Sequence, residues 1–390
     1  MRTFEQTHPW LKFTVDLRPA KPLLWILLGE AASKCDHLSK VPLQPATAHR
    51  IHQLYLAKGV AATTAVEGNT LSEDEVLRAV QGKLQVPPSK EYLKQEVDNI
   101  IAACNQISKG MIEGRKDRLD TAFLCDLNHL TLERLPLGED VEAGALRRHS
   151  VVVGSIYRGA PAEDCPYLVR RLCEWLSGPD FAAPAGMETI HAILKAIISH
   201  LYLAWIHPFG DGNGRTARLI EFFLLMEAGI PSPAAHLLSN HYNQTSSEYY
   251  RQLDYASKSG GDMIPFIAYA VQGLVDGLKS QLDFIWEEHW DIVWRNYVHD
   301  LFAEKTNKAE IRQYQLALEL GAHGDWVRIQ DIDNISPKLA KFYANKTSKT
   351  LQRDIQQLIE LGLATREEKR VRARRELILA FLPPRKADTI

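Results

Sequence analysis

The stretch from His207 to Arg218 is the most chemically dense part of this 390-residue chain. It stands between two apolar runs with helical periodicity, so we expect a loop that leads into a helix N-terminus. Such a terminus binds anions, because its first N–H groups have no partner within the helix. The glycines of the loop add further N–H groups, and its two arginines add forks of donors suited to phosphate oxygens. Asp211 could hold Mg²⁺ beside the phosphates, and His207 is a candidate general base. These residues indicate nucleotidyl or phosphoryl transfer.

The same stretch matches every fixed position of the Fic-family signature, His-Pro-Phe-x-Asp-Gly-Asn-Gly-Arg-x-x-Arg, so the chain resembles this family. Most proteins similar to the family are adenylyltransferases, which move AMP from ATP onto a Ser, Thr or Tyr hydroxyl of a target protein. The resemblance implies that His207 deprotonates this hydroxyl and that Asp211 binds Mg²⁺ across the α and β phosphates. It puts Arg215 on the β phosphate and Arg218 on the γ phosphate. The residues implied in binding ATP or its phosphates are Gly212, Asn213, Gly214, Arg215, Thr216 and Arg218.

Residues 63–69, Thr-Thr-Ala-Val-Glu-Gly-Asn, form a second telling segment at the end of an expected helix. They resemble the inhibitory motif of Fic proteins, in the class where this motif precedes the catalytic core. The implied mechanism is electrostatic, because Glu67 would pair with Arg218 and occupy the guanidinium that the γ phosphate needs. Thr63 would hold the helix in register, and Gly68 completes the motif. Without the signature downstream, the segment could be a plain helix C-terminus.

Two more segments are expected to belong to the site. Val151–Val153 and Ile156-Tyr157 are β-prone runs broken by Gly154-Ser155, which predicts a small hairpin. In the family, a hairpin flap after a similar Gly-x-x-Arg segment pairs with the target by main-chain contacts. Tyr249-Tyr250-x-x-Leu253 resembles a family segment near the adenine pocket, so Tyr250 is expected to bind ATP by stacking on the base. Aromatic residues at helical spacing are, however, more often core residues.

Composition limits the remaining possibilities. The chain is 45% hydrophobic and 24% charged, as in ordinary globular proteins, and is long enough for two or three domains. Its net charge of −2 gives no overall attraction to nucleic acid or to a membrane surface. No apolar run approaches the roughly 20 residues of a transmembrane helix, so we expect no membrane partner. The five cysteines form no C-x-x-C pair and indicate a reduced, cytoplasmic protein.

The expected fold is mainly α. The resemblance implies a Fic-type helical bundle core with a small β-hairpin flap, and the pattern of the tail predicts a C-terminal winged helix-turn-helix domain. We expect an N-terminal helical region with the inhibitory motif over residues 1–115, a Fic catalytic core over 116–290 and the winged helix over 300–390.

The winged helix is predicted from three expected helices, a charge-rich hairpin and a β-prone segment over residues 376–382. Residues 338–376 hold eleven Lys or Arg against five Asp or Glu, a net charge of +6 that favours DNA contact. The expected DNA contacts are Lys349 and Arg353 on the recognition helix and Arg370, Arg372, Arg374 and Arg375 on the wing. Because winged helices also dock proteins or form dimers, protein contact and a homodimer remain open.

The combined prediction is a protein adenylyltransferase that uses ATP and Mg²⁺, is inhibited by Glu67 and modifies a target hydroxyl or itself. The same site could also remove AMP. One alternative is a Fic-like transferase with another nucleotide donor. The other is a DNA-binding regulator whose Fic core only senses nucleotide.

Overall fold

The computed structural model divides into two compact units, Met1–Gln281 and Leu282–Ile390. The first unit holds the predicted N-terminal region and most of the predicted catalytic core, and their separation into two domains stays a prediction. The residues that the structure describes are 2–115, 117–153, 157–305 and 307–378.

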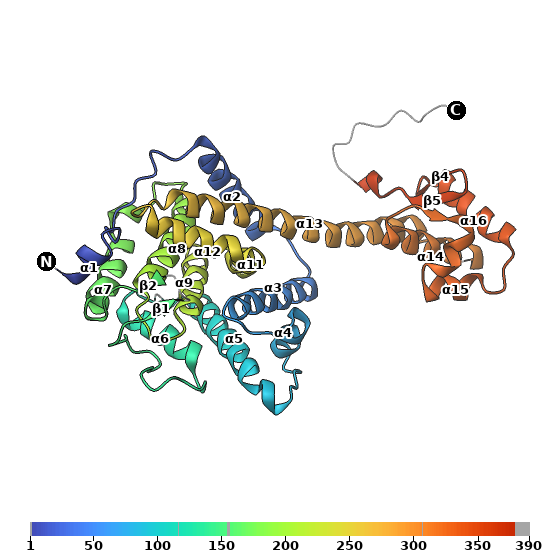
Figure 1. The fold of residues 1–390 in the computed structure, drawn as a ribbon. Helices are drawn as coiled ribbons and strands as arrows, with labels where there is room; N and C mark the ends of the chain where they lie inside the picture. The colour runs from blue at the N-terminus through green and yellow to red at the C-terminus, as the bar shows by residue number, and fades with distance from the viewer. Residues whose placement is uncertain (1, 116, 154–156, 306, 379–390) are drawn as a thin grey trace. The chain divides into compact units, whose positions relative to one another are not determined.

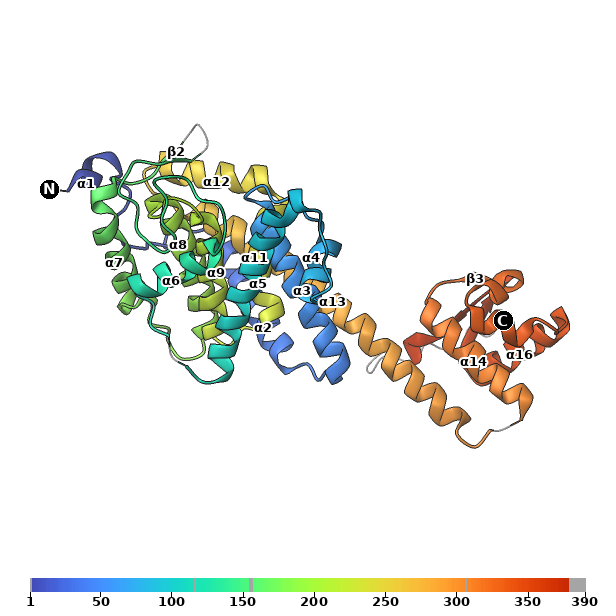
Figure 2. The same cartoon turned by 90° about the horizontal axis from the view of Figure 1, so that it is seen from below.

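The first unit is built around two helices, α8 (Glu188–Ile206) and α9 (Asn213–Glu227), which lie side by side in its middle (Figures 1 and 2). Among the described residues, α8 alone has the length and hydropathy of a membrane span, yet 72% of that span is buried within the unit. An apolar helix buried on most sides is a core helix. The helices of this unit around the pair are α1 (Thr3–Thr7), α2 (Pro22–Lys40), α3 (Pro45–Ala65), α4 (Glu73–Val80), α5 (Glu91–Ile112), α6 (Thr121–Leu132), α7 (Cys165–Leu176), α10 (Ser232–Ala235), α11 (Leu237–Gln244) and α12 (Ser246–Lys258).

The turn after α3 brings the predicted inhibitory segment to the site. The N–H of Glu67 donates to the carbonyl of Thr64 (3.0 Å), and Gly68 has a φ of 97°, which favours glycine. The next helix, α4, is capped by Ser72, whose hydroxyl accepts the N–H of Glu75 (3.3 Å) in a capping box. The chain therefore leaves α3 in a fixed turn.

The predicted hairpin is present. β1 (Val152–Val153) pairs antiparallel with β2 (Tyr157–Arg158), with Val153 opposite Tyr157. The connecting residues 154–156 lie outside the described residues. The strands thus confirm the β-prone runs on both sides of the predicted turn.

The second unit contains the three predicted helices followed by the predicted hairpin, and it adds a short strand between the first two helices that the sequence did not predict. The strands form one antiparallel sheet in the order β3-β5-β4. Long helix α13 (Ile264–Phe302) begins in the first unit and supplies its last turns to the core of the second. The other elements are α14 (Lys308–His323), β3 (Val327–Arg328), α15 (Pro337–Tyr343), α16 (Ser348–Glu360), β4 (Ala364–Glu367) and β5 (Arg370–Ala373).

One local prediction in this unit is wrong. Residues 376–382 were expected to be extended, but the structure has a 3-10 turn, η5 (Arg375–Ile378), and residues 379–382 lie outside the described part. Arg375 anchors this turn, because it bonds Asp291 (2.8 Å) and the carbonyl of Gly321 (3.0 Å). These tertiary contacts override the local β propensity.

Candidate active site

The signature loop is shaped by its own residues. His207 ends α8 in the left-handed region, with φ 50° and ψ 59°, which turns the chain sharply toward α9. The side chain of Asn213 then closes the loop, since its amide donates to the carbonyl of Phe209 and accepts the N–H of Phe209, both at 2.9 Å. Gly212, with φ 73°, precedes the first turn of α9 and offers no side-chain cap. A phosphate contact from Asn213 would therefore come from its backbone N–H.

Arg147 holds His207 in place. Arg147 is 4% exposed, and its guanidinium donates to the carbonyls of His207 (2.6 Å), His149 (2.7 Å) and Ile206 (3.3 Å), and also to that of Ala160. These carbonyls include the negative end of α8, where a cation is favourable. Arg147 is the last residue of the Gly-x-x-Arg segment. The sequence did not predict that this segment would position the general base His207.

The environment of His207 keeps its imidazole neutral. Burial lowers the pKa of His207 to about 4, and the charge of Arg147 adds to this effect. The carbonyl of Ala204 and the negative charges of Glu67 and Asp211 oppose it without reversing the direction. At neutral pH the ring is therefore free to accept a proton, as a general base requires.

Asp211 presents one free carboxylate oxygen. Its side chain is 52% exposed, and Oδ1 accepts the N–H of Gly212 and an Arg215 N–H (3.1 Å). No group among the described residues donates to Oδ2. This oxygen is available to a cation.

Arg215 is fixed by two carboxylates. Besides Asp211, it bonds Glu96 on α5 at 3.1 Å, and its side chain is only 5% exposed. Glu96 in turn accepts from Asn69 (2.8 Å), which lies two residues after Glu67. The sequence gave Glu96 no role, because its contacts with Arg215 and Asn69 join segments far apart in the chain.

The predicted pair of Glu67 and Arg218 is formed. An Arg218 N–H donates to Glu67 Oε1 at 2.5 Å and to the backbone carbonyl of Thr63 at 3.0 Å. Arg218 is 1% exposed and Glu67 is 34% exposed. Burial is the largest single influence and would raise the pKa of the Glu67 carboxyl, but the charge and hydrogen bond of Arg218, together with the electrostatic effects of Arg215 and His207, lower that pKa below its ordinary value. The carboxylate is thus charged and held.

Glu67 also occupies the space above the first turn of α9. A Cβ added at Gly214 would meet Glu67 Oε1 at 2.1 Å. The carboxylate therefore fits against this turn only because residue 214 has no side chain. The Glu67 carboxylate thus occupies the position at which the N–H groups and dipole of α9 would bind an anion.

Beside this anion position lies a cavity of about 640 Å³. The hydroxyl of Tyr250 donates to the carbonyl of Val66 at 3.1 Å, which links α12 to the inhibitory turn. The cavity joins Glu67, His207, Gly214 and Tyr250, as the sequence predicts for one site. Its lining residues are Val66, Glu67, Val153, Tyr157, His200, Ala204, Trp205, His207, Gly214, Ala217, Tyr249, Tyr250, Leu253 and Asp254.

Two further buried side chains support the loop without sequence signals of their own. Asn128 on α6 donates to the carbonyl of Asp211 (2.9 Å) and to the hydroxyl of Thr216 (3.2 Å). The N–H of Thr216 donates to Gly212 (2.9 Å), so both polar groups of Thr216 are used inside the loop. His200 Nδ1 lies 3.0 Å from Glu221 Oε2, so this buried pair joins α8 to α9 at the wall of the cavity.

Comparisons with known proteins agree with this geometry. The sequence model of the Fic/DOC family matches residues 118–225, from α6 through most of α9. The chain contains a Fic/DOC-family domain. Around that domain it is 28% identical over 246 residues to the protein adenylyltransferase Fic of Nematostella vectensis, covering 63% of this chain and 53% of that protein. It is also 28% identical over 230 residues to protein adenylyltransferase fic-1 of Caenorhabditis elegans, covering 57% and 42%.

Solved structures show the same fold. A Fic family protein from Desulfovibrio desulfuricans superposes with a TM-score of 0.57 at 20% identity, covering 92% of this chain and 98% of that one. Fic-1 from C. elegans gives a TM-score of 0.53 at 23% identity, covering 67% and 72%. The chain spans about half the length of the curated relatives it matches. The Fic fold is therefore shared, and the predicted mainly α fold is confirmed.

Proposed function

We propose that this protein transfers AMP from ATP to a Ser, Thr or Tyr hydroxyl of a target protein, or of itself. The observation that carries the proposal is the charged Glu67 carboxylate, bound to Arg218 above the N-terminus of α9 and beside His207. A site that holds one carboxylate in this way can hold a phosphate chain when the carboxylate leaves. The names of the curated relatives, protein adenylyltransferases, support the same reaction.

In the proposed reaction, the target hydroxyl oxygen forms a bond to the α phosphorus of ATP. The bond between that phosphorus and the bridging oxygen to the β phosphate breaks, and pyrophosphate leaves. The hydroxyl proton moves to the neutral imidazole of His207, which Arg147 holds at the C-terminus of α8. Arg215 and Arg218 would neutralise the charge that develops on the leaving pyrophosphate. The nucleoside would lie in the adjoining cavity, next to Tyr250.

The residues present also fit the Mg²⁺ ion that the family implies. Asp211 Oδ2 is a hard oxygen donor with no partner among the described residues, on an exposed side chain beside the proposed phosphates. Mg²⁺ is commonly held by one or two carboxylates together with substrate phosphates and water. When bound, it would neutralise charge on the phosphate oxygens.

We also propose that Glu67 inhibits the reaction. Arg218 cannot bond Glu67 and the γ phosphate fully at the same time, and the Glu67 carboxylate lies in the anion position itself. ATP must therefore displace Glu67 before it can bind productively. Removal of AMP from a modified target at the same site remains a prediction.

A mass measurement tests the function. The purified protein is incubated with ATP and Mg²⁺, and the modified product is analysed by intact-mass spectrometry and peptide mapping. An added mass equal to AMP, absent in His207→Ala, supports the proposal. A different added group would show another donor, and no addition even in Glu67→Gly would favour a regulator that only senses nucleotide.

The cellular location and the oligomeric state of the protein are also proposals. A cytoplasmic location would keep reduced the five cysteines, none of which is paired in the structure. A homodimer stays a prediction, which sedimentation of the purified chain would check. Contact with DNA is proposed for the second unit alone.

A further inference from the structure

The second unit contains a helix-turn-helix whose second helix, α16, exposes basic and amide side chains on its outer face. α15 and α16 are joined by residues 344–347, a turn length typical of this motif. Lys349, Gln352 and Arg353 are exposed on α16 at spacings that put them on one face of the helix. Gln356, one turn further, donates to Glu360 at the far end of the helix.

The one acidic residue in the middle of α16 is hidden. Asp354 is 2% exposed and accepts bonds from Arg312 (2.9 Å) and from the hydroxyl of Tyr343 (2.9 Å). Its charge is therefore neutralised inside the unit. The exposed residues of α16 before Glu360 therefore carry positive, amide or hydroxyl groups and no negative charge.

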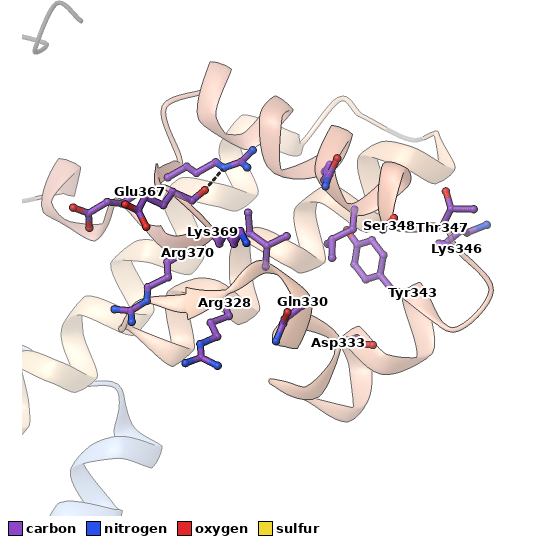
Figure 3. A pocket seen from close by; sticks show the side chains of 15 residues that line it. Arg328, Gln330, Asp333, Tyr343, Lys346, Thr347, Ser348, Glu367, Lys369 and Arg370 are labelled. Carbon is purple, nitrogen blue, oxygen red and sulfur yellow. Dashed lines mark hydrogen bonds between the residues drawn. The ribbon is translucent and has the colours of Figure 1, made fainter.

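A groove of about 1020 Å³ runs between the first turn of α16 and the β4–β5 hairpin. Figure 3 shows Arg328, Lys369 and Arg370 toward one end of the groove and Lys346, Thr347 and Ser348 toward the other. Acidic side chains are also present, since Glu367 and Glu368 lie at the hairpin turn. Asp333 lines the groove as well, so the groove is polar and holds five Lys or Arg against three Asp or Glu.

Two arginines in this groove lie directly opposite each other on neighbouring strands. Arg328 on β3 and Arg370 on β5 are cross-strand partners, and both are exposed. Like charges directly opposite each other destabilise a sheet. Glu367 is the neighbour of Arg370 on β4, yet neither arginine forms an ion pair within the described residues. A bound anion would remove this repulsion.

The other arginines predicted on the wing are engaged in the unit itself. Arg372 lies over the ring of Trp326 at 4.9 Å, and Arg374 lies 4.0 Å from Glu376. Arg375 bonds Asp291 at 2.8 Å. These contacts leave Arg370, out of the four predicted wing arginines, as the one that lines the groove.

We propose that the outer face of α16 enters the major groove of duplex DNA while Arg328, Lys369 and Arg370 contact the phosphate backbone. An α-helix fits the major groove of B-form DNA, and Lys, Arg and Gln side chains can bond base edges there. The major groove of A-form RNA is too narrow and deep for such a helix. DNA is therefore favoured over RNA of the same charge.

The test uses the full chain and a fluorescent duplex DNA of mixed sequence, with binding followed by anisotropy over a series of salt concentrations. Lys369→Gln/Arg370→Gln is compared with the control Arg295→Gln/Lys308→Gln, which removes the same charge from exposed residues outside the groove. The groove variant should bind about tenfold more weakly and lower the salt slope by about two, because each lost phosphate contact reduces the slope by about one. The control should keep the wild-type affinity and slope.

Three outcomes would overturn the proposal. They are no saturable binding of DNA by the wild-type chain, equal weakening in both variants, and equally tight binding of an RNA duplex of the same length. Matching thermal melts would show that the exposed substitutions leave the unit folded. His207→Ala should bind DNA as the wild type does, so failure here is separable from failure of AMP transfer.

Discussion

Replacing Glu67 by glycine should strengthen ATP binding, because the glutamate no longer competes for Arg218. A hydrogen bond to a charged group contributes about 1.5–3 kcal/mol, and the lower end applies because the Glu67 side chain is 34% exposed. Since 1.4 kcal/mol corresponds to a factor of ten, Glu67→Gly should lower the KM for ATP about tenfold. The rate of self-modification at low ATP should rise by a similar factor. Glu67→Gln keeps the shape without the charge and should give a smaller increase.

The assay is incorporation of labelled AMP over a range of ATP concentrations, with Glu73→Gly as a control for a new glycine in the neighbouring helix. Thermal unfolding gives a second reading. Without Glu67, the buried charge of Arg218 loses its carboxylate, so the variant should melt earlier than the wild type and gain more from added ATP. An unchanged KM in Glu67→Gly, or an equal change in Glu73→Gly, would refute the reasoning.

Three further predictions follow from the buried groups. Because the pKa of His207 is lowered from 6.5 to about 4, the imidazole stays neutral as the pH falls through 6.5, and kcat/KM of Glu67→Gly should decline only as the pH approaches 4; a decline centred near 6.5 would contradict this. Arg147→Gln should lower kcat about 100-fold with little change in KM, because His207 loses its anchor, and steady-state kinetics would check this split. Asp354→Asn should destabilise the second unit by about 3–5 kcal/mol, because it leaves the Arg312 charge uncompensated, while AMP transfer persists; calorimetry should show a separate early transition.

Local sequence was enough to predict most elements of the fold. The helices on both sides of the signature follow from apolar periodicity, and the loop between them follows from its glycines and proline. The hairpin strands were predicted from β-prone runs around a Gly-Ser pair. The segment over residues 376–382 was predicted wrongly as extended, because long-range contacts of Arg375 hold its first residues in a 3-10 turn.

The supports of the site could not be predicted in this way. Arg147 lies 60 residues before His207 in the chain, and Glu96 lies 119 residues before Arg215. Asn128 looked like an ordinary helix residue until the fold put it below Asp211. Buried carbonyls and charges need partners, and tertiary packing decides which side chains come close enough to supply them.

The sequence by itself determined the chemistry of this protein: a base, a carboxylate, two arginines and the N–H groups of one helix within twelve residues. It also indicated Glu67 as the competitor for Arg218. Only the tertiary structure decided that the Glu67 carboxylate lies in the space left by Gly214, and that three of the four wing arginines contact other side chains of the second unit. The reason is physical, because residue type and spacing set what a group can bind, whereas burial and neighbours set whether it is free to do so.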